Sequence, residues 1–221
     1  MRIAWFGLLD SDEVTSPPRA RAERHLLQLG QQVVAAAGVG ATIELISCGA
    51  SASTRTLAPG VERVVLVAAG RTHTVWDRVS WALPEVIDRA DLVHLHEGFS
   101  RSCELALLVA KQLRKPVCVT EWGIEGYWLS TELRLSELAD VIICHDRAGP
   151  LTPTCTKPVE TIACDIDIRQ LGVPAPWPAN ACLAETNDEI AWPTVGQYRA
   201  AGSQLWGVYG RLTAGARRAA A

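Results

Sequence analysis

Hydrophobic residues along this chain form short continuous runs that alternate with longer segments of helical periodicity. The short runs predict strands at residues 1–9, 41–47, 61–67, 92–96, 116–120, 141–144 and 159–163. The periodic segments predict helices at residues 19–37, 74–90 (interrupted by Pro84), 102–113, 129–139 and 192–216. Strands that are buried on both faces of a parallel sheet are apolar throughout. The pattern therefore predicts an α/β fold, a Rossmann-like parallel sheet with helices on both faces.

The alternation breaks once, near residue 170. Pro174, Pro176 and Pro178 come close together and are followed by asparagines and acidic residues, which is typical of a loop or linker. The sequence predicts one domain at residues 1–169, a linker at 170–191 and a final helix at 192–216.

Size and charge narrow the classes of function. The 221 residues carry 21 Lys and Arg against 24 Asp and Glu, a net charge of -3. This balance argues against a general binder of nucleic-acid backbones, which usually has a basic excess. The apolar run at residues 1–9 is too short for a signal peptide, and no run approaches the ~20 residues of a membrane span. We expect a cytoplasmic protein without a transmembrane segment.

The seven cysteines are odd in number, and no two are spaced like zinc or disulfide ligands. We expect most to be reduced thiols in the core. No Gly-x-Gly-x-x-Gly, Walker or Gly-x-Ser-x-Gly motif is present. We expect no cofactor.

Polar residues that follow the predicted strands are the candidates for chemistry, because open parallel sheets bind ligands beyond the carboxyl ends of their strands. The candidates are Gly7 at the end of the first strand, His96 and Glu97 at the end of strand 92–96, Glu121, Trp122 and Gly123 after strand 116–120, and His145 after strand 141–144.

Three of these residues could act as a general base, namely His96, Glu97 and Glu121. His94 and His96 lie on one face of their strand and with Glu97 could ligate a metal, although His-x-His is common at strand ends without metal. We expect no metal. Trp122 could stack on a sugar ring or pack at a domain edge.

Several segments in order along the chain resemble family 4 glycosyltransferases of GT-B fold. ADLVHLHE at residues 90–97 resembles the Asp-hydrophobic-Val-His-x-His-Asp strand of that family, and KPVCVTEWG at 115–123 resembles its Lys-Pro-Val-Val-Val-Thr-x-His-Gly segment. Further resemblances are MRIAWFG at 1–7, AERHLL at 22–27, ADVI at 139–142, TIACDID at 161–167 and the closing helix within 188–212. The resemblance implies the N-terminal, acceptor-side domain of a GT-B enzyme, with the closing helix packing back on it.

The departures from the family pattern concern the sugar donor. Only about twenty-five residues lie between Asp167 and Trp192, where the family has its nucleotide-sugar domain, and a single βαβ unit needs ~30. Arg21 stands near the place of the family's Gly-Gly, and Trp122 stands where the family has a histidine.

Three functions remain open. The first is the acceptor-binding half of a split glycosyltransferase or a pathway partner, with a small-molecule or glycan acceptor in a cleft formed by His96, Glu97, Glu121 and Trp122. Further candidates for ligand binding are Gly7, Arg21, His94, Gly123 and His145. A donor-domain subunit or a second copy of the chain would cover the face left by the missing domain. The second is a stand-alone enzyme with a His/Glu acid-base or metal site. The third is a non-catalytic scaffold or regulator.

Overall fold

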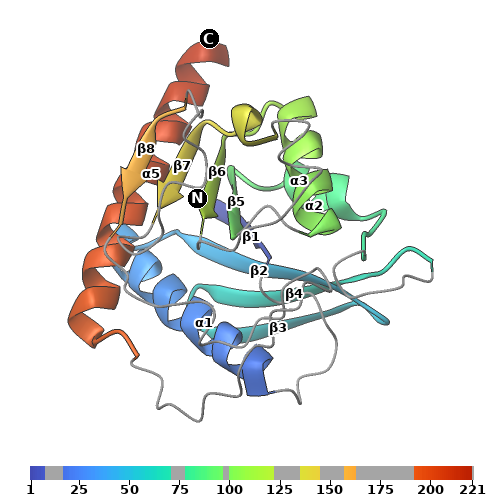
Figure 1. The fold of residues 1–221 in the computed structure, drawn as a ribbon, viewed down its shortest axis with the longest axis horizontal. Coiled ribbons are helices and arrows are strands. Elements are labelled where there is room, and N and C mark those ends of the chain that lie inside the picture. Colours follow the sequence, from blue (N-terminus) through green and yellow to red (C-terminus); the bar gives the residue numbers. More distant parts are fainter. Residues whose placement is uncertain are drawn as a thin grey trace, which may run out of the picture.

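A computed structural model describes residues 1–7, 17–70, 78–96, 100–121, 135–144, 157–162 and 192–220 of the chain. The described strands form one eight-stranded sheet in the order β3-β4-β2-β1-β5-β6-β7-β8 (Figure 1). The strands are β1 (Arg2–Phe6), β2 (Thr42–Gly49), β3 (Ser53–Ala58), β4 (Val61–Val67), β5 (Leu92–His96), β6 (Val117–Glu121), β7 (Val141–Cys144) and β8 (Val159–Thr161).

Seven of these strands confirm the predicted parallel sheet, since β1, β2 and β4 to β8 all pair in parallel. The eighth, β3, lies at the sheet edge and runs antiparallel to β4. The strands predicted from the sequence leave out this stretch, which is wrong. Most of β3 is exposed, so its Ser-Thr-Arg-Thr sequence lacks the apolar run that marks the buried strands.

Helices cover both faces of the sheet, as predicted. Helices α1 (Pro17–Ala37) and α5 (Val195–Ala220) pack side by side on one face (Figure 1). Helices α2 (Leu83–Asp88) and α3 (Arg101–Gln112) and the 3-10 turn η2 (Leu135–Leu138) lie on the other. Each face has its own apolar layer. The first includes Ile3, Trp5, Leu26 and Leu205, and the second includes Phe6, Val93, Ile87 and Leu107.

Local sequence signals explain where two helices begin. Pro84 stands in the first turn of α2, so it begins this helix and does not interrupt a longer one. Helix α5 begins at Val195 behind a capping box, in which Thr194 Oγ1 accepts from the Gln197 N–H and Gln197 Oε1 accepts from the Thr194 N–H. The predicted start at residue 192 is therefore three residues early, and the helix continues past the predicted end at 216.

Helix α5 lies close against α1 at Gly202. A Cβ atom on Gly202 would lie 2.6 Å from the carbonyl carbon and from the Cβ of Gln32. The side chains nearby add a hydrogen bond of 2.9 Å between the buried Tyr198 Oη and His25 Nδ1 of α1. A glycine at the crossing therefore lets the two helices approach closely enough for this buried contact.

Two aspartates in equivalent places connect neighbouring strands at the amino-terminal ends of the strands, which we call the amino-terminal edge of the sheet. Asp91 accepts a hydrogen bond from the Arg2 N–H at 2.8 Å, and its own N–H donates to the Arg2 carbonyl. Asp140 exchanges the same pair of bonds with Val117 of the neighbouring strand. Each aspartate thus aligns the start of one strand with the next.

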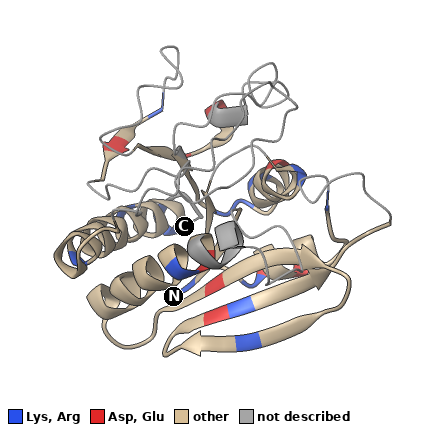
Figure 2. Cartoon of the chain, turned by 60° about the horizontal axis from the view of Figure 1, so that its bottom comes forward, with Lys and Arg blue, Asp and Glu red and all other residues tan. Residues whose placement is uncertain are grey.

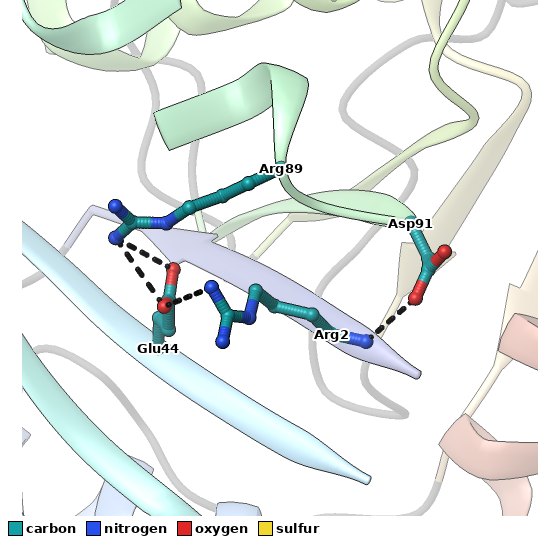
Figure 3. A network of polar contacts seen from close by, with 4 residues as sticks. All are labelled: Arg2, Glu44, Arg89 and Asp91. Carbon is teal, nitrogen blue, oxygen red and sulfur yellow. Dashed lines mark hydrogen bonds and ion pairs between the residues drawn. The ribbon is translucent and has the colours of Figure 1, made fainter. Parts of the chain in front are cut away.

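A buried carboxylate lies at the same edge. Glu44 of β2, with a side chain 3% exposed, pairs with Arg89 at 3.3 Å and with Arg2 at 3.6 Å (Figure 3). The two guanidinium groups balance a charge that would be costly to bury alone. This network lies at the opposite end of the strands from the predicted functional residues.

Charges of both signs are interspersed over the described strands and helices (Figure 2). On the α1 side, Glu23 pairs with Arg63 at 3.0 Å and with Arg55 at 3.1 Å. Among the helices in the described part of the chain, none is both long and apolar enough to cross a membrane.

Candidate ligand-binding site at the sheet edge

The strand order defines one place where a ligand is expected. The chain leaves β1 toward β2 on one side and later forms β5 on the other side of β1. Strands β1 and β5 therefore flank the topological switch point, beyond whose carboxyl ends open α/β sheets bind their ligands. Phe6 is in register with Leu95, so Gly7 and His96 are the next residues on either side of this point.

Gly7 has a left-handed backbone, with φ of 96°. A Cβ atom there would lie 2.2 Å from the His96 carbonyl oxygen and 3.2 Å from Cys103 Sγ. Glycine is therefore required for the turn that ends β1. Its predicted role in ligand binding stays a prediction, while the structure gives it a packing role.

Helix α3 begins beside Gly7. Ser100 caps the helix by accepting a hydrogen bond from the Cys103 N–H at 3.2 Å, and its hydroxyl lies 2.9 Å from that of Ser102. Both serines are buried. The first turn of α3 thus lies beside the switch point and carries two buried hydroxyl groups.

His94 is fully buried beneath α5. Its Nδ1 lies 2.5 Å from Tyr209 Oη and its Nε2 lies 2.6 Å from Thr120 Oγ1. A neutral imidazole donates from one nitrogen and accepts at the other, so both positions are used here. His94 therefore links α5 to β5 and β6. Its predicted role in ligand binding stays a prediction.

His96 lies in the same buried layer. Its ring stacks on His94 at a centroid distance of 4.0 Å and contacts the Trp5 ring at 4.6 Å. Burial raises the pKa of the neighbouring Tyr209 well above its usual value, a nearby Cys118 adds to the shift, and Trp5 opposes it. The phenol therefore remains protonated. The role of His96 as a general base stays a prediction.

The structure describes only the backbone of some of the other predicted site residues and nothing of the rest. Glu121 is the last residue of β6 and is paired with Cys144, and Arg21 belongs to α1. Their side chains are outside what the structure describes, as are four whole residues, namely Glu97, Trp122, Gly123 and His145. Within the described ranges, no three His, Cys, Asp or Glu residues are grouped to hold a metal ion.

One polar residue at this edge was missed by the sequence interpretation. Glu104, in the first turn of α3, is 5% exposed. It lies among the buried positions Cys103, Ala106 and Leu107 of that helix. An acidic residue on the apolar side of the predicted helix 102–113 is the signal that could have revealed it.

The fold class is thus an α/β protein with a mostly parallel sheet covered on both faces. No protein-family model matches the chain. The comparison with curated proteins likewise finds no match. Among solved structures, the chain is similar to MurG of Acinetobacter baumannii, with 13% identity and a TM-score of 0.38 over 72% of this chain. The chain spans 44% of the length of that MurG chain.

Proposed function

We propose that this chain binds the acceptor of a glycosyltransferase at the β1–β5 switch point and acts as the acceptor-side half of such an enzyme. The observation that carries the proposal is the arrangement at this point. Gly7, the end of β5 and the first turn of α3 are adjacent there. Two of the segments that resemble the acceptor-side domain of family 4 glycosyltransferases, MRIAWFG and ADLVHLHE, contain β1 and β5, whose carboxyl ends lie side by side at this point.

The donor site would come from a separate polypeptide. About twenty-five residues between Asp167 and Trp192 replace the nucleotide-sugar domain of the family. A βαβ unit alone needs ~30 residues. We therefore expect the chain to bind an acceptor without binding the nucleotide of a sugar donor.

One observation favours a second candidate, a non-catalytic scaffold with the same fold. Both ring nitrogens of His94 serve hydrogen bonds in the core, and His96 is buried against Trp5. A catalytic group must reach the substrate. In a scaffold these histidines would be core residues only.

The test is a binding experiment with purified chain. Saturation-transfer NMR would use the methyl glycosides of glucose, galactose, mannose and N-acetylglucosamine as acceptor probes, with UDP and GDP as donor probes. We expect binding of at least one glycoside and of neither nucleotide.

Hydrogen exchange would locate the bound glycoside. Protection is expected at Gly7, at the end of β5 and in the first turn of α3. Protection confined to the Glu44 edge, or binding of UDP or GDP, would contradict the proposal. A chain that binds none of the probes favours the scaffold.

A further inference from the structure

The Glu104 carboxyl group is buried in the first turn of α3, and one of its oxygens has no hydrogen-bond partner among the described residues. Glu104 Oε1 is inaccessible to solvent and makes no hydrogen bond within the structure described here. Its other oxygen lies 3.5 Å from Arg101 Nη1, and the Arg101 side chain is 42% exposed. Leaving a buried acceptor unpaired costs folding free energy, and native proteins seldom do so without a functional reason.

The position of the carboxyl group relates it to the site. Side chains on a helix lean toward its amino terminus, and the ion pair with Arg101 holds the Glu104 carboxyl group over the first turn of α3. That turn contacts Gly7 through Cys103. The unpaired oxygen therefore belongs to the same edge of the sheet as the ends of β1 and β5.

The chemistry of a carboxyl group selects the kind of ligand. A carboxylate accepts hydrogen bonds from hydroxyl groups and repels phosphates and other anions. Burial raises the pKa of Glu104, and the Arg101 guanidinium opposes the shift. The carboxyl group is thus suited to a neutral ligand that carries hydroxyl groups, such as a saccharide.

We infer that Glu104 is a ligand-binding residue of the switch-point site and that its Oε1, covered in the unliganded chain, becomes accessible when a saccharide binds and then accepts a hydrogen bond from a saccharide hydroxyl. This inference rests on the proposed function, because it takes the ligand to be a glycosyl acceptor. It adds a residue that neither the strand-end motifs nor the family resemblance indicated.

The experiment compares Glu104→Gln with a matched control, Glu85→Gln, in the full chain. Glu85 also lies in the first turn of a helix, α2, but is exposed. Each variant is unfolded thermally and titrated with whichever methyl glycoside binds the wild type. We expect Glu104→Gln to raise Tm by about 2–6 °C, because a buried charge is removed. The same change should weaken glycoside binding about tenfold or more.

The Glu85→Gln control should change neither quantity appreciably. A lower Tm or a failure of Glu104→Gln to fold would make Glu104 a residue that supports the fold and would overturn the inference. Unchanged glycoside affinity in Glu104→Gln would overturn the inference alone. A wild-type chain that binds no glycoside would overturn the proposed function and this inference with it.

Discussion

Replacing glycine by alanine at two positions of α5 should change the stability of the fold in opposite directions, because only one of them lies where α5 crosses α1. At Gly202, an added methyl group would lie 2.6 Å from the carbonyl carbon of Gln32 and 2.9 Å from the Val33 N atom. Ordinary contact begins at 3.4 Å, so α5 would have to move by about 0.8 Å. At Gly210, by contrast, no atom lies within 4 Å of the added carbon.

The magnitudes follow from two effects. Alanine in place of glycine stabilises a helix interior by about 0.8–1 kcal/mol. Overpacking costs about 1–3 kcal/mol, and the upper end applies at Gly202 because the obstructing atoms include the α1 backbone. We expect Gly202→Ala to lose about 2 kcal/mol and Gly210→Ala to gain about 0.5–1 kcal/mol. For a chain of this size the loss lowers Tm by about 4–8 °C.

Thermal unfolding followed by circular dichroism at 222 nm measures both variants against the wild type. Gly210→Ala is the matched control, because it makes the same chemical change at an exposed site on the same helix. Equal stability of Gly202→Ala and Gly210→Ala would contradict the expected steric conflict at Gly202. That result would mean that α5 does not lie against α1 as described.

Three further predictions concern other parts of the fold. Tyr209→Phe removes the hydrogen bond from α5 to the buried His94 and should lower the free energy of unfolding by about 1–3 kcal/mol, measured by urea denaturation. Arg114→Gly should raise the free energy of unfolding by about 0.5–1 kcal/mol, because Arg114, which follows α3, has a left-handed φ of 54°. A lower free energy of unfolding would contradict this. The raised pKa of Glu104 means that its proton is lost less readily in the folded chain. Wild-type stability relative to Glu104→Gln should therefore fall as pH rises above about 4.5, with little difference below it; a pH-independent difference would refute this.

The parallel sheet could be predicted because its signal is local. Most of the parallel strands are short apolar runs, as burial on both faces of the sheet requires, whereas the edge strand β8 is largely exposed. Strand β3 could not be found in this way, because an exposed edge strand needs no apolar residues. The start of α5 could have been read more closely, since Thr194 and Gln197 form a capping box visible in the sequence.

The candidate site was harder to predict because burial depends on distant parts of the chain. The spacing of His94 and His96 places both on one face of β5, but α5 covers that face more than a hundred residues later. Nothing near His94 in the sequence indicates that Tyr209 will occupy its Nδ1. For Glu104, the amphipathic pattern of the helix was visible in the sequence. Its unpaired oxygen could not be predicted, because it depends on the packing around α3.

The residues that carry the family resemblance therefore separate by physical role. Asp91 and Asp140, in the two Ala-Asp motifs, fasten neighbouring strands through paired backbone hydrogen bonds at the amino-terminal edge. His94 holds α5 on the sheet. Residues with these roles would be retained by any chain that kept the fold, with or without chemistry, so their presence supports the architecture and not an activity. At the other end of the strands, packing explains Gly7, and Glu104 is the residue that indicates a ligand. A scaffold that bound nothing there would be more stable without the buried, unpaired carboxyl oxygen of Glu104.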